Sequence, residues 1–421
     1  MFSIMKQLFN RSNKDLRKRI YFTLFCLAIF SIGTTITVPW VAKFAYQEYG
    51  VMEIFNLMSG GGLKQFSIFA LGVTPYINAQ IITQLLQMDI IPYFKELKEE
   101  GYTGKQKINK ITRYLGILIA FLQGFIFTRV YAGSSDAMEI VKTTVVFTAG
   151  TSLLLWMGDQ ITKKGIGNGL SLLIMAGILQ SMPNIFKEAF NGLITSGTFK
   201  LPLGIGLFSA FILVYILIIV GVVWVQLAER RIPIQYANRT NSAYGGHQNY
   251  LPIKINSAGV IPVIFATMLL SLPATIVNFI GNEKAINFVN KYIANTTPVG
   301  FIIYIVLIFL FGYFYTFLEM NPEEMSKNLN KSGAYIPGVR PGNATMEYVS
   351  NVLSKLTIVG SLFLVIIAAL PILFTQFSGL SSSVTIGGTG LLIVVGVAIE
   401  SYKQLESSLI SRSHRYGKGR N

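Results

Sequence analysis

The chain alternates between long, uncharged apolar stretches and shorter polar segments along its whole length. A helix that crosses a hydrocarbon core of about 30 Å needs roughly 20 mostly apolar residues, so each long stretch predicts one membrane span. The pattern predicts ten spans, at residues 20–39, 69–88, 114–128, 143–158, 166–186, 203–227, 257–280, 299–318, 356–377 and 378–399. The expected fold class is therefore an all-α polytopic membrane protein with ten transmembrane helices.

The composition supports this prediction and argues against a soluble enzyme. Charged residues make up 13% of the 421 residues and hydrophobic residues 52%, with a mean hydropathy of +0.53, whereas a soluble domain is about 25% charged. Of the 35 Lys and Arg residues, 27 lie in the two termini and the connections on their side of the membrane, and 8 lie in the other connections. By the positive-inside rule, both termini are expected in the cytoplasm. Because the basic residues lie between apolar runs, we expect no sequence-specific nucleic-acid partner.

Few residues are candidates for chemistry. No Asp, Glu, Lys or Arg lies inside a predicted span, which disfavours a secondary solute transporter, although sodium coupling through carbonyl and hydroxyl groups stays open. No nucleophile–base pair or carboxylate dyad lies inside a span, so we expect a protein that is not an enzyme. Cys26 is the only cysteine and the two histidines are far apart, so we expect no metal and no cofactor.

Residues 51–66 form an apolar segment that is too short to cross the membrane. The segment reads VMEIFNLMSGGGLKQF, with three consecutive glycines at residues 60–62. One interpretation is an external loop with a helical turn. The other is a short apolar helix that folds back into the protein interior on a flexible glycine hinge, because glycine permits backbone angles that other residues resist. The sequence leaves both interpretations open.

The second predicted span combines apolar and polar positions. Val73, Ile77 and Ile81 recur at a spacing of four, which places them on one helical stripe. Threonine, asparagine and glutamine residues flank this stripe, and such groups are poorly solvated in lipid. This combination favours a span that faces a wet cavity.

Two connections on the cytoplasmic side, residues 229–252 and 320–342, are unusually long and polar. Either could be a solvated connector, but loops of this length are more often functional than shorter ones. Prolines and glycines at 337, 338, 341 and 342 predict fixed turns around Arg340. The two loops follow the sixth and eighth spans and could form one docking face.

Seven segments, taken together and in order, resemble the SecY family of bacterial protein-translocation channels, and the match runs along nearly the whole chain. They read FNLMSGGGLKQFSIFALGVTPYINAQIITQLLQ, GYTGKQKINKITRY, GDQITKKGIGNGLSLLI, RRIPIQYA, LPIKINSAGVIPVIFA, NPEEMSKNLNKSGAYIPGVRPG and GGTGLLIVVGVAIE. In its details the sequence is most similar to family members from low-GC Gram-positive bacteria.

The resemblance implies two pseudo-symmetric five-helix halves around a central pore that holds a plug helix. The implied parts are a cytoplasmic N-terminal segment at 1–19, an N-terminal half at 20–186, an external hinge loop at 187–202, a C-terminal half at 203–399 and a cytoplasmic tail at 400–421. The plug corresponds to 51–66, with Phe55, Asn56, Met58, Ser59, Gly60, Gly61 and Gly62. The pore ring corresponds to Val73, Ile77, Leu170, Ile174, Ile264 and Ile393. All six are aliphatic, and a narrow aliphatic constriction excludes water and ions.

The family also opens sideways, between the second and third spans and between the seventh and eighth. By resemblance, Gln84, Asn168 and Asn256 lie near this lateral gate, where neutral amides could hold it shut with modest hydrogen bonds. The two long loops correspond to the surface that receives the motor ATPase SecA or the ribosome, with candidate contacts at Arg230, Arg231, Arg239 and Arg340. At the NPEE motif, Glu323 stands where some relatives carry arginine, so charge-specific contacts there are not transferred.

The resemblance implies the central subunit of the Sec channel in the bacterial plasma membrane. Such a subunit translocates unfolded preproteins and inserts membrane proteins through its lateral gate. The implied partners are SecE, SecG, SecA, the ribosome, preprotein signal sequences and membrane lipids. An accessory SecY paralogue for specialised substrates is the alternative, and a secondary solute transporter is a less favoured one.

Overall fold

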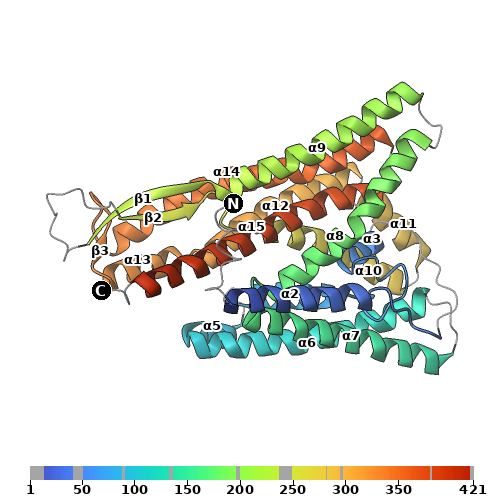
Figure 1. The fold of residues 1–421 in the computed structure, drawn as a ribbon, viewed down its shortest axis with the longest axis horizontal. Coiled ribbons are helices and arrows are strands. Elements are labelled where there is room, and N and C mark those ends of the chain that lie inside the picture. The colour runs from blue at the N-terminus through green and yellow to red at the C-terminus, as the bar shows by residue number, and fades with distance from the viewer. Residues whose placement is uncertain are drawn as a thin grey trace. The chain divides into compact units, whose positions relative to one another are not determined.

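The computed structural model of the chain describes residues 14–40, 51–87, 91–131, 136–195, 200–236, 249–280, 282–293, 297–379 and 382–417. Helices dominate these residues, and three short strands form one sheet (Figure 1). In chain order the elements are α2 (Lys14–Gly33), α3 (Val51–Met58), α4 (Thr74–Leu86), α5 (Pro92–Glu99), α6 (Tyr102–Tyr131), α7 (Ala137–Lys164), α8 (Gly169–Phe190), the π-helical turn η2 (Asn191–Thr195), α9 (Leu201–Leu227), β1 (Glu229–Tyr236), β2 (Asn249–Lys254), α10 (Ile261–Ile280), α11 (Glu283–Tyr292), α12 (Pro298–Glu319), α13 (Pro322–Lys331), β3 (Ala334–Tyr335), α14 (Asn343–Ser378) and α15 (Ser382–Gly417).

Each of the ten predicted spans coincides with one of these helices, with differences at the ends. Among the described residues, six helical segments are long and apolar enough to cross a membrane. They are Tyr102–Arg129, Ala137–Lys164, Gly169–Thr195, Leu201–Leu227, Pro298–Lys331 and Asn343–Ser378, and α10 adds a shorter apolar stretch, Ile261–Ala274. The hydropathy pattern therefore placed the helices correctly, and the structure is that of a helical membrane protein.

The helix in the second predicted span begins later than its apolar stretch. Residues 69–73 form turns, and α4 starts only at Thr74. Gly72 has a φ of +57°, a left-handed conformation that an α-helix cannot include, and Pro75 suits the first turn because its missing N–H is not needed there. The local sequence thus sets the start of α4 next to the turn that follows α3.

Contacts divide the described residues into two compact units. The first comprises those within Met1–Ile205, Ala274–Ile286 and Leu380–Asn421, and the second those within Gly206–Pro273 and Asn287–Gly379. The change of unit after Ile205 lies just beyond the predicted hinge loop at 187–202. Helix α15 packs against α3 and α8 and so belongs to the first unit, although the sequence assigns it to the C-terminal half. The predicted halves rest on pseudo-symmetry rather than on contacts, and they stay a prediction.

The two long polar loops contain a three-stranded antiparallel sheet in the order β2-β1-β3, which the sequence analysis did not predict. Strand β1 pairs with β2 over six residue pairs from Glu229↔Lys254 to Ile234↔Asn249, and with β3 at Gln235↔Tyr335. Alternate residues of β1 and β2 point to opposite faces of the sheet. The inward residues Ile232 of β1 and Ile253 of β2 join a buried cluster. The cluster also contains Ile336, which follows β3, and Val349 and Leu353 of α14. The loops are therefore a folded platform within the second unit.

Candidate functional site

The apolar segment at 51–66 is a short helix that lies inside the first unit. Phe55, Leu63 and Phe66 are buried, and they join one hydrophobic cluster with residues of α6 and α7. The ring of Phe55 meets that of Phe127 on α6 edge to face, with 5.4 Å between the ring centres. Of the two interpretations that the sequence left open, the structure supports the helix that folds back into the interior.

The glycine run ends α3 with a compact turn whose hydrogen bonds lie within the segment, and we call residues 59–64 the glycine turn. The amide of Gly61 donates to the carbonyl of Asn56 at 2.8 Å, and that of Gly60 donates to the carbonyl of Leu57 at 3.2 Å. This pair of bonds is a Schellman cap, which requires the left-handed φ of +69° at Gly60, and Gly61 that follows is also left-handed with a φ of +81°. Glycine is needed here because it adopts this conformation without steric cost.

Two side chains complete the glycine turn. The hydroxyl of Ser59 accepts a hydrogen bond from the amide of Leu63 at 3.1 Å, and the side-chain oxygen of Asn56 accepts one from the amide of Lys64 at 2.9 Å. The backbone groups of the turn are thus satisfied mainly within the segment itself. Such a segment can keep its hydrogen bonds when it changes its surroundings.

Three glycines on surrounding elements let the end of α3 approach their backbones closely. A Cβ on Gly177 of α8 would lie 2.6 Å from the carbonyl oxygen of Met58, closer than real Cβ atoms approach such a group. A Cβ on Gly390 of α15 would lie 2.9 Å from Leu57, and one on Gly72 would lie 3.2 Å from the Cα of Ser59. We call these three residues the glycine cradle. They were not predicted from the sequence, because a glycine inside an apolar helix gives no indication of what packs on it.

Three of the predicted ring residues adjoin the cradle. Val73 follows Gly72 directly, while Ile174 and Ile393 lie one helical turn from Gly177 and Gly390 respectively. All three side chains are buried, as is Ile77 on the next turn of α4. The glycines that contact the end of α3 are therefore next to, or one helical turn from, buried aliphatic residues.

The other two predicted ring residues are placed differently. Leu170 is only partly buried, and its side chain packs against Gly158 of α7, where a Cβ would lie 2.7 Å from it. Ile264 is buried on α10, within the second unit. The assignment of all six residues to one ring stays a prediction.

A glutamine on α8 contacts this region and was not predicted. The side-chain amide of Gln180 donates to the hydroxyl of Thr34, just beyond the end of α2, at 2.8 Å. Its carbonyl oxygen is buried without a hydrogen-bond partner among the described residues, and it lies 3.0 Å from the position that a Cβ on Gly60 would take. Gln180 thus ties α8 to the chain after α2, immediately beside the glycine turn.

Two of the three amides predicted at the lateral gate make local contacts. Asn168 caps the N-terminus of α8 by accepting from the amide of Leu170, and Asn256 donates to the carbonyl of Gly259 at 2.9 Å. The side-chain oxygen of Gln84 is buried and has no hydrogen-bond partner in the described part of the chain. The gate itself stays a prediction, and two of its amides serve the backbone near them.

The predicted docking arginines divide between the sheet and the loop before α14. Arg230 and Arg231 are exposed on β1, and Arg239 lies outside the described residues. The Nε of Arg231 donates to Glu229 at 2.8 Å, and its guanidinium lies 4.6 Å from the ring centre of Tyr250. The hydrogen bond from Arg231 to Glu229 raises the pKa of the guanidinium, so this side chain stays charged. The outward face of the sheet therefore presents a fixed positive group.

Arg340 lies in a loop whose turns are set by proline and glycine, as the sequence predicted. The amide of Val339 donates to the carbonyl of Ile336 at 3.0 Å across Pro337 and Gly338. Gly338 has a φ of +81°, which matches a turn with proline second and glycine third. The guanidinium of Arg340 is exposed and has no ion pair among the described residues. The loop thus holds a free cation at a rigid position.

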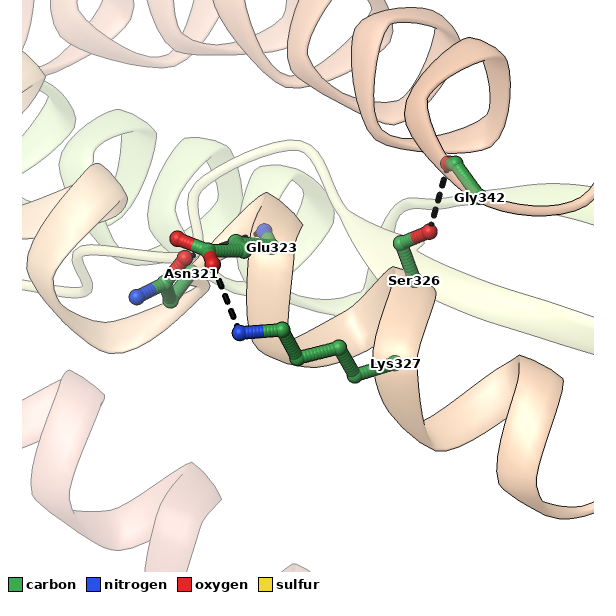
Figure 2. Close-up of polar contacts among 5 residues, drawn as sticks. All are labelled: Asn321, Glu323, Ser326, Lys327 and Gly342. Atoms are coloured by element: carbon green, nitrogen blue, oxygen red, sulfur yellow. Dashed lines mark hydrogen bonds and ion pairs between the residues drawn. The ribbon is translucent and has the colours of Figure 1, made fainter. Parts of the chain in front are cut away.

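Helix α13 braces this loop, as Figure 2 shows. The hydroxyl of Ser326 donates to the carbonyl of Gly342 at 2.8 Å, where the loop enters α14. The side chain of Asn321 caps α13 by accepting from the amide of Glu323. Lys327 donates to Glu323 at 2.6 Å, one turn away, and this hydrogen bond lowers the pKa of the Glu323 carboxyl. Glu323 is therefore held at the start of α13, where the helix dipole favours a negative charge.

Solved structures of other proteins have the same fold. A protein-conducting channel matches with a TM-score of 0.69 at 21% identity, and the match covers 95% of this chain and 94% of that chain. The channel from a canine ribosome–channel complex of the endoplasmic reticulum matches with a TM-score of 0.64 at 21% identity and the same coverage. At this identity the likeness shows the fold alone. The chain therefore has the fold of the protein-conducting channels.

Sequence comparisons give the family. The SecY family model matches residues 67–402. The protein translocase subunit SecY of Bacillus subtilis (strain 168) is 45% identical over 414 residues, which cover 95% of this chain and 96% of that protein. The chain belongs to the SecY family, and it is a channel subunit of a protein translocase. The resemblance noted in the sequence, including its leaning toward low-GC Gram-positive bacteria, is confirmed.

Proposed function

We propose that this chain forms the conduit through which unfolded preproteins cross the bacterial plasma membrane, and that residues 51–66 are its plug. The observation that carries the proposal is the set of close contacts around the end of α3. This end rests on the glycine cradle, whose glycines lie next to or one helical turn from the buried aliphatic residues Val73, Ile174 and Ile393 in the chain. The close approach to Gly177 and Gly72 involves the backbone of α3's end, so few side chains have to rearrange there when the segment leaves and returns. Phe55 also has to leave its contact with Phe127.

The proposed constriction consists of the six predicted ring residues, from Val73 to Ile393. Aliphatic side chains offer no hydrogen bonds to water or ions, so a narrow ring of them dewets and blocks leakage. The same side chains can move through their rotamers around a passing polypeptide. The plug adds a second barrier while no substrate is present.

Apolar segments leave the channel through the proposed lateral gate near Gln84, Asn168 and Asn256. Interhelical hydrogen bonds of neutral amides contribute only about 0.6–2 kcal/mol each in membranes. A helical signal sequence buries enough apolar surface to exceed this amount, since each buried CH₂ contributes about 0.8 kcal/mol. We therefore propose that signal recognition is chiefly the partition of an apolar helix into lipid at this seam.

The platform of β1, β2, β3 and α13 is the proposed docking face for SecA or the ribosome. Its exposed arginines, Arg230, Arg231 and Arg340, suit carboxylates or phosphates because a guanidinium binds them with two parallel hydrogen bonds. The channel itself catalyses nothing in this proposal, so the energy comes from the motor, from translation or from the membrane potential. SecE and SecG are the proposed companion subunits, and both termini lie in the cytoplasm.

The test is reconstitution of the chain with SecE, SecG, SecA, ATP and a preprotein in lipid vesicles. We expect the preprotein to become protected from external protease only when ATP is present. Arg340→Glu should reduce this protection strongly while leaving assembly with SecE intact, and Lys142→Glu, an exposed charge reversal on α7 outside the proposed docking face, is the matched control. Full protection with Arg340→Glu would contradict the docking assignment, and no protection with the wild-type chain would contradict the proposed function.

The ring is tested separately by ion conductance in planar bilayers. Ile77→Asn and Ile264→Asn each place an amide where the proposal needs a dry surface, so each should increase the conductance of the idle channel. Substitution of Leu213, an exposed residue of α9, by asparagine serves as control. An unchanged leak in both ring variants would contradict the assigned constriction.

A further inference from the structure

Helix α11 is a ten-residue helix that connects α10 and α12, the seventh and eighth predicted spans. Helix α10 ends at Ile280 and α11 begins at Glu283, so only residues 281 and 282 separate them. Since consecutive Cα atoms are 3.8 Å apart, α11 begins within about 11 Å of the end of α10. Helix α12 then begins at Pro298. The short connections keep α11 close to the surface at which these spans leave the membrane.

The two faces of α11 differ in chemistry. Val289 is buried, whereas Phe288 and Tyr292 are 58% and 41% exposed and their ring centres are only 5.0 Å apart. The ammonium of Lys291 lies 5.6 Å from the ring centre of Tyr292, and Lys284 is exposed one turn before Phe288. An aromatic pair accompanied by lysines is thus directed away from the protein.

The neighbouring helices show what surrounds this aromatic pair. On α10, Ile276 and Ile280 are exposed in its last turns, and on α12, Val299 and Ile302 are exposed in its first turns. Exposed isoleucine and valine on spanning helices face the hydrocarbon of the bilayer, because contact between this apolar surface and water is unfavourable. Lipid therefore extends to the end of α10 and to the beginning of α12, on either side of α11 along the chain.

We propose that α11 lies in the membrane interface, with Phe288 and Tyr292 inserted among the lipid headgroups and Lys284 and Lys291 directed at their phosphates. The chemistry is that of an interfacial amphipathic helix, in which aromatic rings sit at headgroup depth and basic side chains reach the phosphates. The inference rests on the proposed membrane arrangement of α10 and α12. The occupant of this face is the lipid surface rather than a protein subunit.

The depth of a spin label tests this placement. Cys26→Ser removes the single cysteine, and Phe288→Cys then carries a nitroxide in the full chain, reconstituted with SecE and SecG in phosphatidylethanolamine–phosphatidylglycerol vesicles. The measurement compares collision of the label with oxygen, which concentrates in the bilayer, and with a water-soluble nickel chelate. Asn287→Cys, exposed on the same helix, is the matched control.

We expect the ratio of oxygen to nickel collisions to be several-fold higher at 288 than at 287. Equal ratios at the two positions would overturn the proposal, since α11 would then lie in water. An immobilised label at 288 with little access to either reagent would also overturn it, because a protein would then cover this face. SecA-driven preprotein protection in the same vesicles shows whether the proposed function holds, independently of where α11 lies.

Discussion

The buried helix α3 with its glycine turn and the polar platform of β1, β2, β3 and α13 are held in place by different interactions. The first satisfies its hydrogen bonds mainly within itself, and it contacts its surroundings through glycines such as Gly177 and through a buried cluster that includes Phe55. The second is joined by strand pairing between distant segments and by a buried cluster that includes Leu353. A segment of the first kind can move away without breaking strand pairing, although it loses the packing of Phe55, whereas the second can change only by losing both its strand pairing and its packing. We expect mutations in the two regions to have separable effects.

The largest effect is expected when the platform loses part of its buried cluster. Leu353→Ala on α14 removes a fully buried side chain that supports the sheet, and such substitutions cost about 2–5 kcal/mol. Thermal unfolding of the purified complex should occur at a lower temperature, and SecA binding should weaken. Leu362→Ala on the same helix, where the side chain is 57% exposed, is the control and should change little. Increased ion leak with Leu353→Ala would show that the two regions are not separable.

The next effect is expected in the cradle. Gly177→Val places a side chain where the carbonyl of Met58 lies 2.6 Å from a Cβ, so the end of α3 has to move or the helices have to separate. Overpacking of this kind costs about 1–3 kcal/mol, and about 2 kcal/mol shifts an equilibrium between seated and displaced plug roughly thirtyfold. Conductance of the idle channel should increase while SecA binding stays normal.

The control for this variant is Gly206→Val on α9, where a Cβ would meet nothing within 4 Å. It changes the same residue type in a helix without affecting the cradle. If Gly177→Val leaked no more than Gly206→Val, the contact between α8 and the end of α3 would have no role in closing the channel.

A smaller effect is expected within the glycine turn itself. Ser59→Ala keeps the size of the side chain but leaves the amide of Leu63 without its acceptor, at a cost of about 1–3 kcal/mol when the group stays buried. The turn can relax by local movement, so the leak should lie between those of the wild type and Gly177→Val. Ser332→Ala, which removes a hydroxyl at the end of α13, is the control. A leak larger than that of Gly177→Val would mean that the turn, and not the cradle, keeps the plug seated.

The sequence predicted the helices of both regions well and their contacts poorly, for a physical reason. Hydropathy is a local property, so the stretches around α6, α7 and α9 were evident without any partner. Strand β3 at Ala334–Tyr335 pairs with β1 about a hundred residues earlier, and neither loop has a strong strand pattern that would indicate such pairing. The position of α3 depends on which groups pack against Gly72, Gly177 and Gly390, and the composition of the sequence cannot show these contacts. The turns around Arg340 were predicted correctly because proline and glycine encode them locally.

The smallest effect is expected at the exposed ion pair of α13. Glu323→Gln removes the partner of Lys327, but both groups are exposed and such pairs contribute little to stability. Because the pKa of Glu323 is lowered in the folded chain, its contribution is present above the ordinary pKa of a glutamate and is lost as the pH falls through the lowered value. Thermal unfolding should therefore differ slightly between Glu323→Gln and wild type at neutral pH and not at all in strong acid.

Glu323→Arg should weaken α13 further, since it places a positive charge at the helix N-terminus. Equal stability of the Gln and Arg variants at neutral pH would show that Glu323 acts only through Lys327.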